Sequence, residues 1–354
     1  MYPRLEINLS KLQNNVKVLN NMCKAQNIDI AIVTKSFCAN TKIVEAICKE
    51  DISYLADSRI SNLKKMKDFA PQKILIRIPM ISEAKEVVEY ADISFNSEIE
   101  TILQLEQECL RQDKTHKVVI MVDLGDLREG YFNENEIYNA IEIIQKLKKI
   151  KLIGIATNLT CYGAIIPTPT NLNRLVEISN NIKEKYSIDL EIISGGNSSS
   201  IHLVENKQMP KEINNLRLGE VVLLGKETAY GQKVNNCEND AFKLVCEVIE
   251  IKNKPSLPIG EIGVDAFGNK PHYEDKGIRK RAIIAIGKQD IVDNTSIKPV
   301  DKDIEILGSS SDHMILDITN SQKTYQIGSK VEFTLTYGSI LSTCTSEYVE
   351  KFFI

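Results

Sequence analysis

The stretch Ile28-Asp-Ile-Ala-Ile-Val-Thr-Lys35 decides the fold of this chain. It is a short apolar run, and a segment of helical character begins near Asn40, which is typical of a buried parallel strand followed by a helix. A lysine at the carboxyl end of such a strand would face the mouth of an α/β barrel, where such folds place their chemistry. A desolvated amine there loses its proton readily and can form a Schiff base with an aldehyde. Most strand-end lysines are solvated surface charges, so Lys35 becomes a candidate only together with the rest of the chain.

Strand-like and helix-like segments alternate through the first two thirds of the chain. Eight short apolar runs are predicted strands: Ile28–Val33, Ser53–Ala56, Lys73–Ile78, Ala91–Ser94, Lys117–Val122, Leu152–Ala156, Leu190–Ile193 and Leu216–Leu218. Apolar stripes at helical spacing lie at Leu12, Val16, Leu19 and Cys23 and at Ile137, Ile141, Ile144 and Leu147. Because eight parallel strands close a barrel and each unit is too short to bury its own apolar face, the pattern predicts a (β/α)8 barrel.

Helix-start signals agree with this alternation. Ser97 with Glu100 is a predicted capping box, and Thr168 places Pro169 at a first helical position. After about Gly231 the chain changes to short β-rich runs between turn residues: Phe242–Ile251, Arg281–Ile286, Ile304–Leu307, His313–Ile318 and Val331–Thr336. Regular short strands without intervening helices indicate a β domain. We therefore expect an α/β protein with a barrel over residues 1–232 and a smaller C-terminal β domain over residues 233–354.

Composition excludes several classes of protein. The 354 residues carry a net charge of −4, which gives no reason to expect nucleic acid or an anionic membrane as a partner. The first residues lack the apolar core of a signal peptide, and no 18-residue apolar run is present to span a bilayer. Eight cysteines without a CxxC pair favour reduced thiols in a cytoplasm. The four histidines have no ligand-like spacing, so we expect no metal site.

A polar loop, Ser194-Gly-Gly-Asn-Ser-Ser-Ser200, directly follows the seventh predicted strand. Its glycines allow a tight turn that exposes backbone N–H groups, and its hydroxyls add donors, which together suit a phosphate group. The loops after strands seven and eight are the usual phosphate site of such barrels. The alternative is a polar loop that only caps a helix.

Two arginines follow other predicted strands at the same rim. Arg217 lies in Leu216-Arg-Leu-Gly-Glu220 at the end of the eighth strand, where Gly219 permits close approach of a ligand. Arg128 lies in Asp123-Leu-Gly-Asp-Leu-Arg-Glu-Gly130 after the fifth strand and could grip a substrate carboxylate with two hydrogen bonds. Either arginine could instead form a structural salt bridge, and Arg128 could pair with Asp126 or Glu129. A lysine, a phosphate loop and two arginines at one rim fit a phosphorylated aldehyde cofactor and an amino-acid substrate.

Over essentially its whole length the chain resembles the fold-type III pyridoxal-phosphate racemases of the alanine racemase family, and within them the ornithine racemase branch. The motifs that carry the resemblance are Ile30-Ala-Ile-Val-Thr-Lys35, Asp123-Leu-Gly-Asp-Leu-Arg128, Ala156-Thr-Asn-Leu-Thr-Cys-Tyr-Gly163, Ser194-Gly-Gly-Asn-Ser-Ser-Ser200, Leu216-Arg-Leu-Gly-Glu220, Ser309-Ser-Ser-Asp-His313 and Cys344-Thr-Ser-Glu-Tyr348. Several motifs in the family's order are more specific than any one alone.

The resemblance implies a role for each matching residue. Lys35 would carry pyridoxal 5'-phosphate covalently, and Arg217 would bond the pyridine nitrogen with Asn158 at the same rim. The phosphate would be held by Ser198, by the backbone of Gly219 and Glu220, and by Tyr348. Arg128 would contact the substrate carboxylate side, and Asp312 would come from the other subunit of a homodimer with shared active sites. A permanent cation beside the ring nitrogen disfavours its protonation, which suits reprotonation of the substrate better than transamination or decarboxylation.

Four positions depart from the alanine racemase pattern. Phe267 replaces the tyrosine that serves as the second base, Met121 replaces a carbamylated lysine, Ala39 replaces a phosphate-contacting tyrosine, and Asn158 replaces a histidine. The second base here is therefore open. Its candidates are Asp265, His272, Tyr273 and His313, of which Tyr273 and His313 are preferred.

The resemblance implies a racemase that interconverts L- and D-ornithine, with the C-terminal domain covering the barrel mouth of a partner. A buried distal amine needs a carboxylate or carbonyl partner, for which the candidates are Glu220, Asp312 and Asp265. The alternatives are an alanine or broad-specificity racemase and a non-catalytic cofactor carrier, whose relatives resemble the barrel alone.

Overall fold

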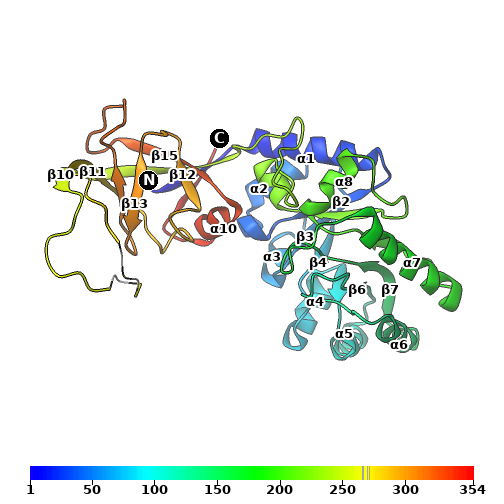
Figure 1. The fold of residues 1–354 in the computed structure, drawn as a ribbon. Helices are drawn as coiled ribbons and strands as arrows, with labels where there is room; N and C mark the ends of the chain where they lie inside the picture. The colour runs from blue at the N-terminus through cyan, green and yellow to red at the C-terminus, as the bar shows by residue number, and fades with distance from the viewer. Residues whose placement is uncertain (265–266, 269, 271) are drawn as a thin grey trace. The chain divides into compact units, whose positions relative to one another are not determined.

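The computed structural model describes residues 1–264, 267–268, 270 and 272–354 (Figure 1). It divides into two compact units. The barrel unit is Leu9–Asn239, and the β unit combines Met1–Asn8 with Asp240–Ile354.

The barrel unit contains a closed barrel of eight parallel strands, arranged in the order in which they occur along the chain. The strands are β2 (Asp29–Val33), β3 (Tyr54–Asp57), β4 (Gln72–Leu75), β5 (Ile93–Asn96), β6 (His116–Met121), β7 (Ile150–Ala156), β8 (Ile192–Ser194) and β9 (Asn215–Leu218). Each overlaps one predicted strand, so the predicted (β/α)8 barrel is confirmed. β2 and β9 close the barrel, with Ala31 opposite Arg217.

Apolar side chains fill the barrel interior. They come from alternate positions of a strand, as in Ala31 and Val33 of β2 and in Ile93 and Phe95 of β5, because successive side chains of a strand point to opposite faces. Phe95 is fully buried. This packed interior leaves the chemistry to the loops that follow the strands.

Helices connect the barrel strands, and Figure 1 shows α3 to α7 around them. The α-helices of this unit are α1 (Leu9–Lys24), α2 (Thr41–Ile47), α3 (Ile60–Lys65), α4 (Ala84–Tyr90), α5 (Ile99–Gln112), α6 (Glu134–Ile144), α7 (Pro169–Tyr186), α8 (Ile201–Glu205) and α9 (Glu220–Leu224). Short 3-10 turns are η1 (Lys35–Phe37), η2 (Ile81–Glu83) and η3 (Ser198–Ser200). The stripe of α1 is fully buried as predicted. In the second stripe Leu147 lies beyond the end of α6 and is half-buried.

One predicted helix start is confirmed and the other is wrong. Thr168 and Asn171 form a reciprocal capping box at the start of α7, with Pro169 at its first position. Ser97 and Glu100 form no capping box, because Glu98 occupies the N-cap of α5 and makes no side-chain cap. β5 runs on to Asn96, two residues beyond the predicted end of the strand, and this displaces the start of the helix.

A buried histidine lies at the start of β6. His116 is 2% exposed, and its Nε2 lies 2.8 Å from Ser94 Oγ. Burial lowers the pKa of His116 from 6.5 to about 4, since charging a ring that is removed from water is unfavourable. The folded protein therefore keeps this ring neutral at pH values where the unfolded chain binds a proton.

We expect the barrel to lose stability as the pH falls from about 6.5 to about 4. The unfolded state binds more protons in that window, and a shift of this size corresponds to roughly 3 kcal/mol of unfolding free energy. Urea unfolding at pH 7 and pH 5 would measure the loss for the natural protein and for His116→Gln. The variant should show a smaller difference, and exposed His272→Gln is the control. Equal pH dependence in all three proteins would contradict this assignment.

The β unit is an antiparallel sheet with one parallel pair and one helix. Its elements are β1 (Arg4–Ile7), β10 (Phe242–Pro255), β11 (Ile278–Ile284), β12 (Ile297–Pro299), β13 (Glu305–Ser309), β14 (Met314–Asp317), β15 (Lys330–Leu335), α10 (Tyr337–Thr345) and β16 (Glu350–Phe353). The strand order is β12-β15-β10-β11-β14-β13, and β1 pairs with β10 and β16. The predicted smaller β domain is therefore present.

The division of the chain differs from the predicted boundary after residue 232. The units divide at Asn239, and Met1–Asn8 belongs to the β unit. The reason is β1, which pairs antiparallel with β10 and parallel with β16 and buries Leu5 and Ile7 completely. A strand can join a sheet from a distant part of the sequence, and its local pattern does not reveal which sheet it joins.

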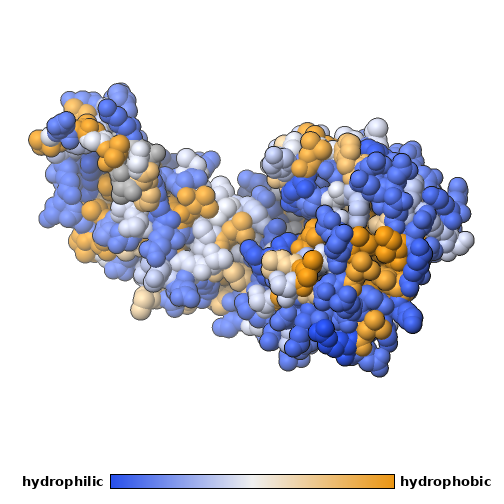
Figure 2. All heavy atoms as spheres, turned by 90° about the horizontal axis from the view of Figure 1, so that it is seen from below, coloured by the Kyte–Doolittle hydropathy of each residue, from blue (hydrophilic) through white to orange (hydrophobic). Residues whose placement is uncertain are grey.

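The face of the molecule drawn in Figure 2 is mostly polar. Figure 2 shows hydrophilic residues over most of the visible face, with hydrophobic residues gathered in patches. Among the helices that the structure describes, none has the length and apolar character needed to cross a membrane.

Candidate active site at the carboxyl end of the barrel

Lys35 directly follows β2 and begins the turn η1. Its backbone is held by Thr34, whose hydroxyl donates a 2.6 Å hydrogen bond to Asp57 Oδ2 at the end of β3. Asp57 also accepts from the backbone of Arg59 and from Asn62. Burial raises the pKa of Asp57, and these hydrogen bonds oppose that rise. The Lys35 side chain is half-buried, and within the described part of the chain no residue makes a hydrogen bond or ion pair with its Nζ. Its amine is therefore available to a ligand.

Arg217 is the buried cation of this site. It is 4% exposed, and its guanidinium donates 2.7 Å hydrogen bonds to Ser194 Oγ and to the Thr157 carbonyl oxygen. Phe95 lies beneath it, with 5.2 Å from Cζ to the ring centroid. Burial lowers the pKa of Arg217 to about 10, so it remains charged at neutral pH. No carboxylate in the described part of the chain forms a salt bridge with Arg217. A buried charge without such a partner is costly for folding, which indicates a functional role.

Asn158 contributes an unused donor beside Arg217. Its Oδ1 accepts from Asn197 Nδ2 at 3.1 Å and from Arg217 at 3.4 Å. Its Nδ2 is buried and finds no partner in the described chain. Sequence reasoning missed Asn197, which fixes the orientation of Asn158 and also accepts from Ser199 N. Asn197 lies within the predicted phosphate loop, and this position in the sequence could have identified it as a candidate site residue.

Ser198 joins the loops after β8 and β9. Its hydroxyl lies 3.3 Å from the backbone N–H groups of both Gly219 and Val221. A Cβ on Gly219 would come within 3.3 Å of Val33, so glycine allows the two strand ends to approach closely. Glu220 begins α9, and burial raises the pKa of its carboxyl group. Long hydrogen bonds from two N–H groups to a serine hydroxyl mark a group of donors that an anion could use.

The loop after β6 is organised by two buried aspartates. Asp126 is fully buried and accepts hydrogen bonds from the backbone N–H groups of Thr160, Cys161, Tyr162 and Ile165. Asp123 Oδ1 accepts from Gly125 and Leu127. Arg128 makes a two-pronged ion pair with Glu129. Of the two partners considered from the sequence, Glu129 is therefore the one that pairs with Arg128, and Asp126 is the anchor of the neighbouring loop.

Replacing Asp126 with alanine is expected to lower the free energy of unfolding by roughly 3 kcal/mol. The change leaves several backbone N–H groups without their charged acceptor and releases the loop that follows β7. Urea unfolding would measure the loss. Asp113→Ala is the matched control, because Asp113 is exposed and pairs with Lys149 at the surface, where an ion pair contributes about 0.5 kcal/mol. Equal effects of the two substitutions would contradict the anchoring role.

Four predicted site residues lie in the β unit. His313 Nδ1 lies 2.9 Å from Asp312 Oδ1, and this hydrogen bond lowers the pKa of Asp312. Tyr273 and Tyr348 are exposed, at 42% and 68%. Asp312 and His313 thus form one cluster. Asp265, another candidate for the second base, lies outside the described residues.

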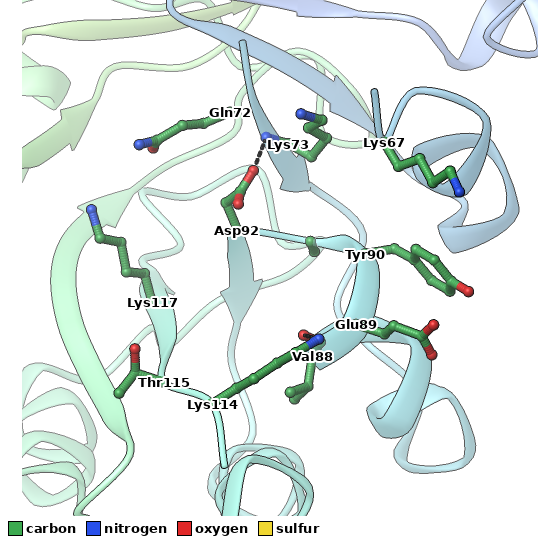
Figure 3. A pocket seen from close by; sticks show the side chains of 11 residues that line it. Lys67, Gln72, Lys73, Val88, Glu89, Tyr90, Asp92, Lys114, Thr115 and Lys117 are labelled. Atoms are coloured by element: carbon green, nitrogen blue, oxygen red, sulfur yellow. Dashed lines mark hydrogen bonds between the residues drawn. The ribbon is translucent and has the colours of Figure 1, made fainter. Parts of the chain in front are cut away.

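A cavity of about 380 Å³ lies at the opposite, amino-terminal end of the barrel strands (Figure 3). Its charged lining residues are Lys67, Lys73, Glu89, Asp92, Lys114 and Lys117. Figure 3 shows Asp92 accepting a hydrogen bond from the backbone of Lys73, at 2.7 Å. None of the predicted site residues lines this cavity, so the candidate site is at the other end.

Several known proteins similar in sequence to this chain are racemases. A family model described as the N-terminal domain of alanine racemase matches residues 7–226. The ornithine racemase of Acetoanaerobium sticklandii is 51% identical over 351 residues, which cover 99% of each chain. The lysine racemase of Thermotoga maritima is 37% identical over 353 residues, which cover 99% of this chain and 98% of the relative.

Solved structures share the fold at lower identity. The alanine racemase of Streptomyces lavendulae has a TM-score of 0.79 at 15% identity, covering 100% of this chain and 98% of that one. The alanine racemase of Bartonella henselae, solved with covalently bound pyridoxal phosphate, has a TM-score of 0.77 at 17% identity, and the match covers 99% of both chains. The likeness extends over the barrel and the β unit together.

Proposed function

The chain belongs to the alanine racemase family, and we propose that it is a pyridoxal-phosphate-dependent racemase that interconverts L- and D-ornithine. The observation that carries this proposal is its 51% identity with an ornithine racemase over 99% of both chains. The lysine racemase at 37% identity also supports a diamino acid as substrate. Alanine racemases are more distant, at 26% identity over 79% of this chain.

The barrel residues fit the cofactor. Lys35 offers an amine that no described side chain occupies, and Ser198 with the Gly219 and Val221 N–H groups offers donors suited to a phosphate. Arg217 offers a buried cation and Asn158 a buried side-chain N–H donor, and neither the cation nor the donor has a partner of the required kind among the residues that the structure describes. We assign the phosphate to Ser198, Gly219 and Glu220 together with Tyr348, and the pyridine ring to Arg217 and Asn158.

Each residue then has a task in racemisation. Bound pyridoxal phosphate draws electron density from the substrate Cα and makes its proton acidic. Lys35 Nζ removes or returns that proton on one face, and a group of the β unit, Tyr273 or His313, serves the other. Arg128 holds the substrate carboxylate with two hydrogen bonds. Arg217 keeps a positive charge at the ring nitrogen, which favours return of the proton over side reactions.

We further propose that the protein is a cytoplasmic homodimer in which each β unit completes the partner's barrel mouth. The β unit carries four exposed candidate site residues, which are Tyr273, Asp312, His313 and Tyr348. They can take part in catalysis only if they lie beside a substrate site. Exposed apolar residues on the loops after β6 and β7, such as Leu127 and Tyr162, favour a covered rim. All eight cysteines are free thiols, which fits a reducing compartment.

The experiment is to incubate L-ornithine with the protein and pyridoxal phosphate in heavy water, with L-lysine and L-alanine alongside. Chiral chromatography with mass detection should find D-ornithine carrying deuterium at Cα, and little D-alanine. Deuterium uptake without inversion would mean that one base works and the opposite one is missing. Cofactor binding without exchange or inversion of any amino acid would favour a non-catalytic carrier. Inversion of alanine at the rate of ornithine would favour a broad-specificity racemase.

A further inference from the structure

A diamino-acid substrate brings a second ammonium group, and in a partly buried site that group needs an anionic partner. Most carboxylates at the carboxyl end of the barrel already accept hydrogen bonds from other groups of the protein. Those that accept two or more hydrogen bonds from backbone N–H groups or neutral side chains are Asp57, Asp123, Asp126 and Glu227. They hold turns and loops in place, and a ligand would have to break those bonds to use them.

Glu129 is different, because its partner is a side chain at the protein surface. It forms the two-pronged ion pair with Arg128, whose side chain is 40% exposed, while Glu129 is 19% exposed. Burial lowers the pKa of Arg217, and the Glu129 carboxylate is the foremost charge that opposes this. Glu129 therefore lies within electrostatic reach of the buried cation at the base of the site.

We infer that Glu129 binds the side-chain ammonium of the substrate and thereby selects diamino acids, an inference that rests on the proposed racemase function. Without substrate, Glu129 and Arg128 neutralise each other. A diamino acid carries one group for each of them, since its carboxylate can take Arg128 and its distal ammonium can take Glu129. The Arg128–Glu129 ion pair is then replaced by two ion pairs with the substrate, and each of these charged groups has a partner.

A neutral amino acid cannot make this exchange. Its carboxylate competes with Glu129 for Arg128, and it supplies no cation to compensate Glu129. An ionised carboxylate left without its partner in a half-buried position is unfavourable. The Arg128–Glu129 ion pair therefore favours binding of ornithine over alanine. Attraction to Glu129 raises the affinity for ornithine, and the carboxylate left unpaired by alanine lowers the affinity for alanine.

The test compares L-ornithine with L-norvaline, which has the same carbon chain but lacks the distal amine. Racemisation kinetics would give kcat/KM for both substrates with the natural protein and with Glu129→Gln, Glu129→Asp and Glu220→Gln. We expect Glu129→Gln to lower the ornithine-to-norvaline ratio by about 10-fold or more, mainly through a higher KM for ornithine. Glu129→Asp, which keeps the charge, should restore part of the ratio. Glu220→Gln should leave the ratio unchanged.

Three outcomes would overturn the inference. An equal loss for both substrates in Glu129→Gln would mean that Glu129 only positions Arg128. An unchanged ratio in Glu129→Gln, with a lowered ratio in Glu220→Gln, would place the ammonium at Glu220. If the natural protein inverts norvaline as fast as ornithine, no residue selects the distal amine. Failure of the natural protein to invert ornithine at all would instead overturn the proposed function, and this inference with it.

Discussion

Replacing Lys35 with alanine is expected to lower ornithine racemisation by about 10³-fold or more. In the proposed mechanism the amine is both the covalent attachment point of the cofactor and the base on one face of the substrate, so both tasks are lost together. Two measurements test this. Chiral chromatography gives the rate, and mass spectrometry after borohydride reduction shows whether the cofactor is fixed to the protein. The variant should gain no cofactor mass on reduction.

Lys42→Ala is the matched control, because Lys42 is an exposed lysine in the helix that follows the same strand. It should retain both activity and the covalent attachment. Cofactor that remains fixable in Lys35→Ala would show that another lysine carries it, and the barrel site would have to be reassigned.

Replacing Arg217 with glutamine is expected to lower racemisation by about 10²-fold. Glutamine can still donate a hydrogen bond toward Ser194 or Thr157, but it removes the positive charge that we propose to lie beside the ring nitrogen. Because Arg217 is buried and no described carboxylate pairs with it, losing its charge should change the free energy of unfolding by less than about 2 kcal/mol. Racemisation assays, urea unfolding and the absorption spectrum of the bound cofactor would separate the two effects.

Arg174→Gln serves as the control, since Arg174 lies on the surface and pairs with Glu134. It should leave activity and spectrum unchanged. If Arg217→Gln loses stability and activity in parallel while the cofactor spectrum stays the same, Arg217 is a structural residue and its assignment to the pyridine ring is wrong.

Local sequence patterns were sufficient for the barrel. Each strand is a short apolar run whose neighbours in the barrel are also its neighbours along the chain, so topology follows from order. Lys35 follows the end of a strand in the sequence, so its position at the carboxyl end of the barrel also follows from the order of the strands. The loop around Ser198 follows a strand end, as its place in the sequence predicted, and its phosphate-binding role stays a prediction.

The patterns failed where partners are distant in sequence. β1 joins a sheet formed by residues more than two hundred positions away, and nothing in Arg4–Ile7 indicates that sheet. The helix start at Ser97 was misplaced because the length of β5 is set by pairing with its neighbours. Asp126 and Asn197 were visible in the motifs, but their partners in the loop after β7 were not.

The sequence by itself determined the barrel, the order of its strands and the rim at which Lys35, Ser198 and Arg217 meet, because these depend on periodicity and on strand ends. Only the tertiary structure decided which charged side chains are available to bind a ligand. Among the described residues, Arg217 is buried with no carboxylate partner, and Glu129 makes its side-chain hydrogen bonds with Arg128 alone. Asp126 already accepts hydrogen bonds from several backbone N–H groups. Whether a charged group can bind a ligand depends on which atoms surround it in space. The sequence does not contain the distances to those atoms.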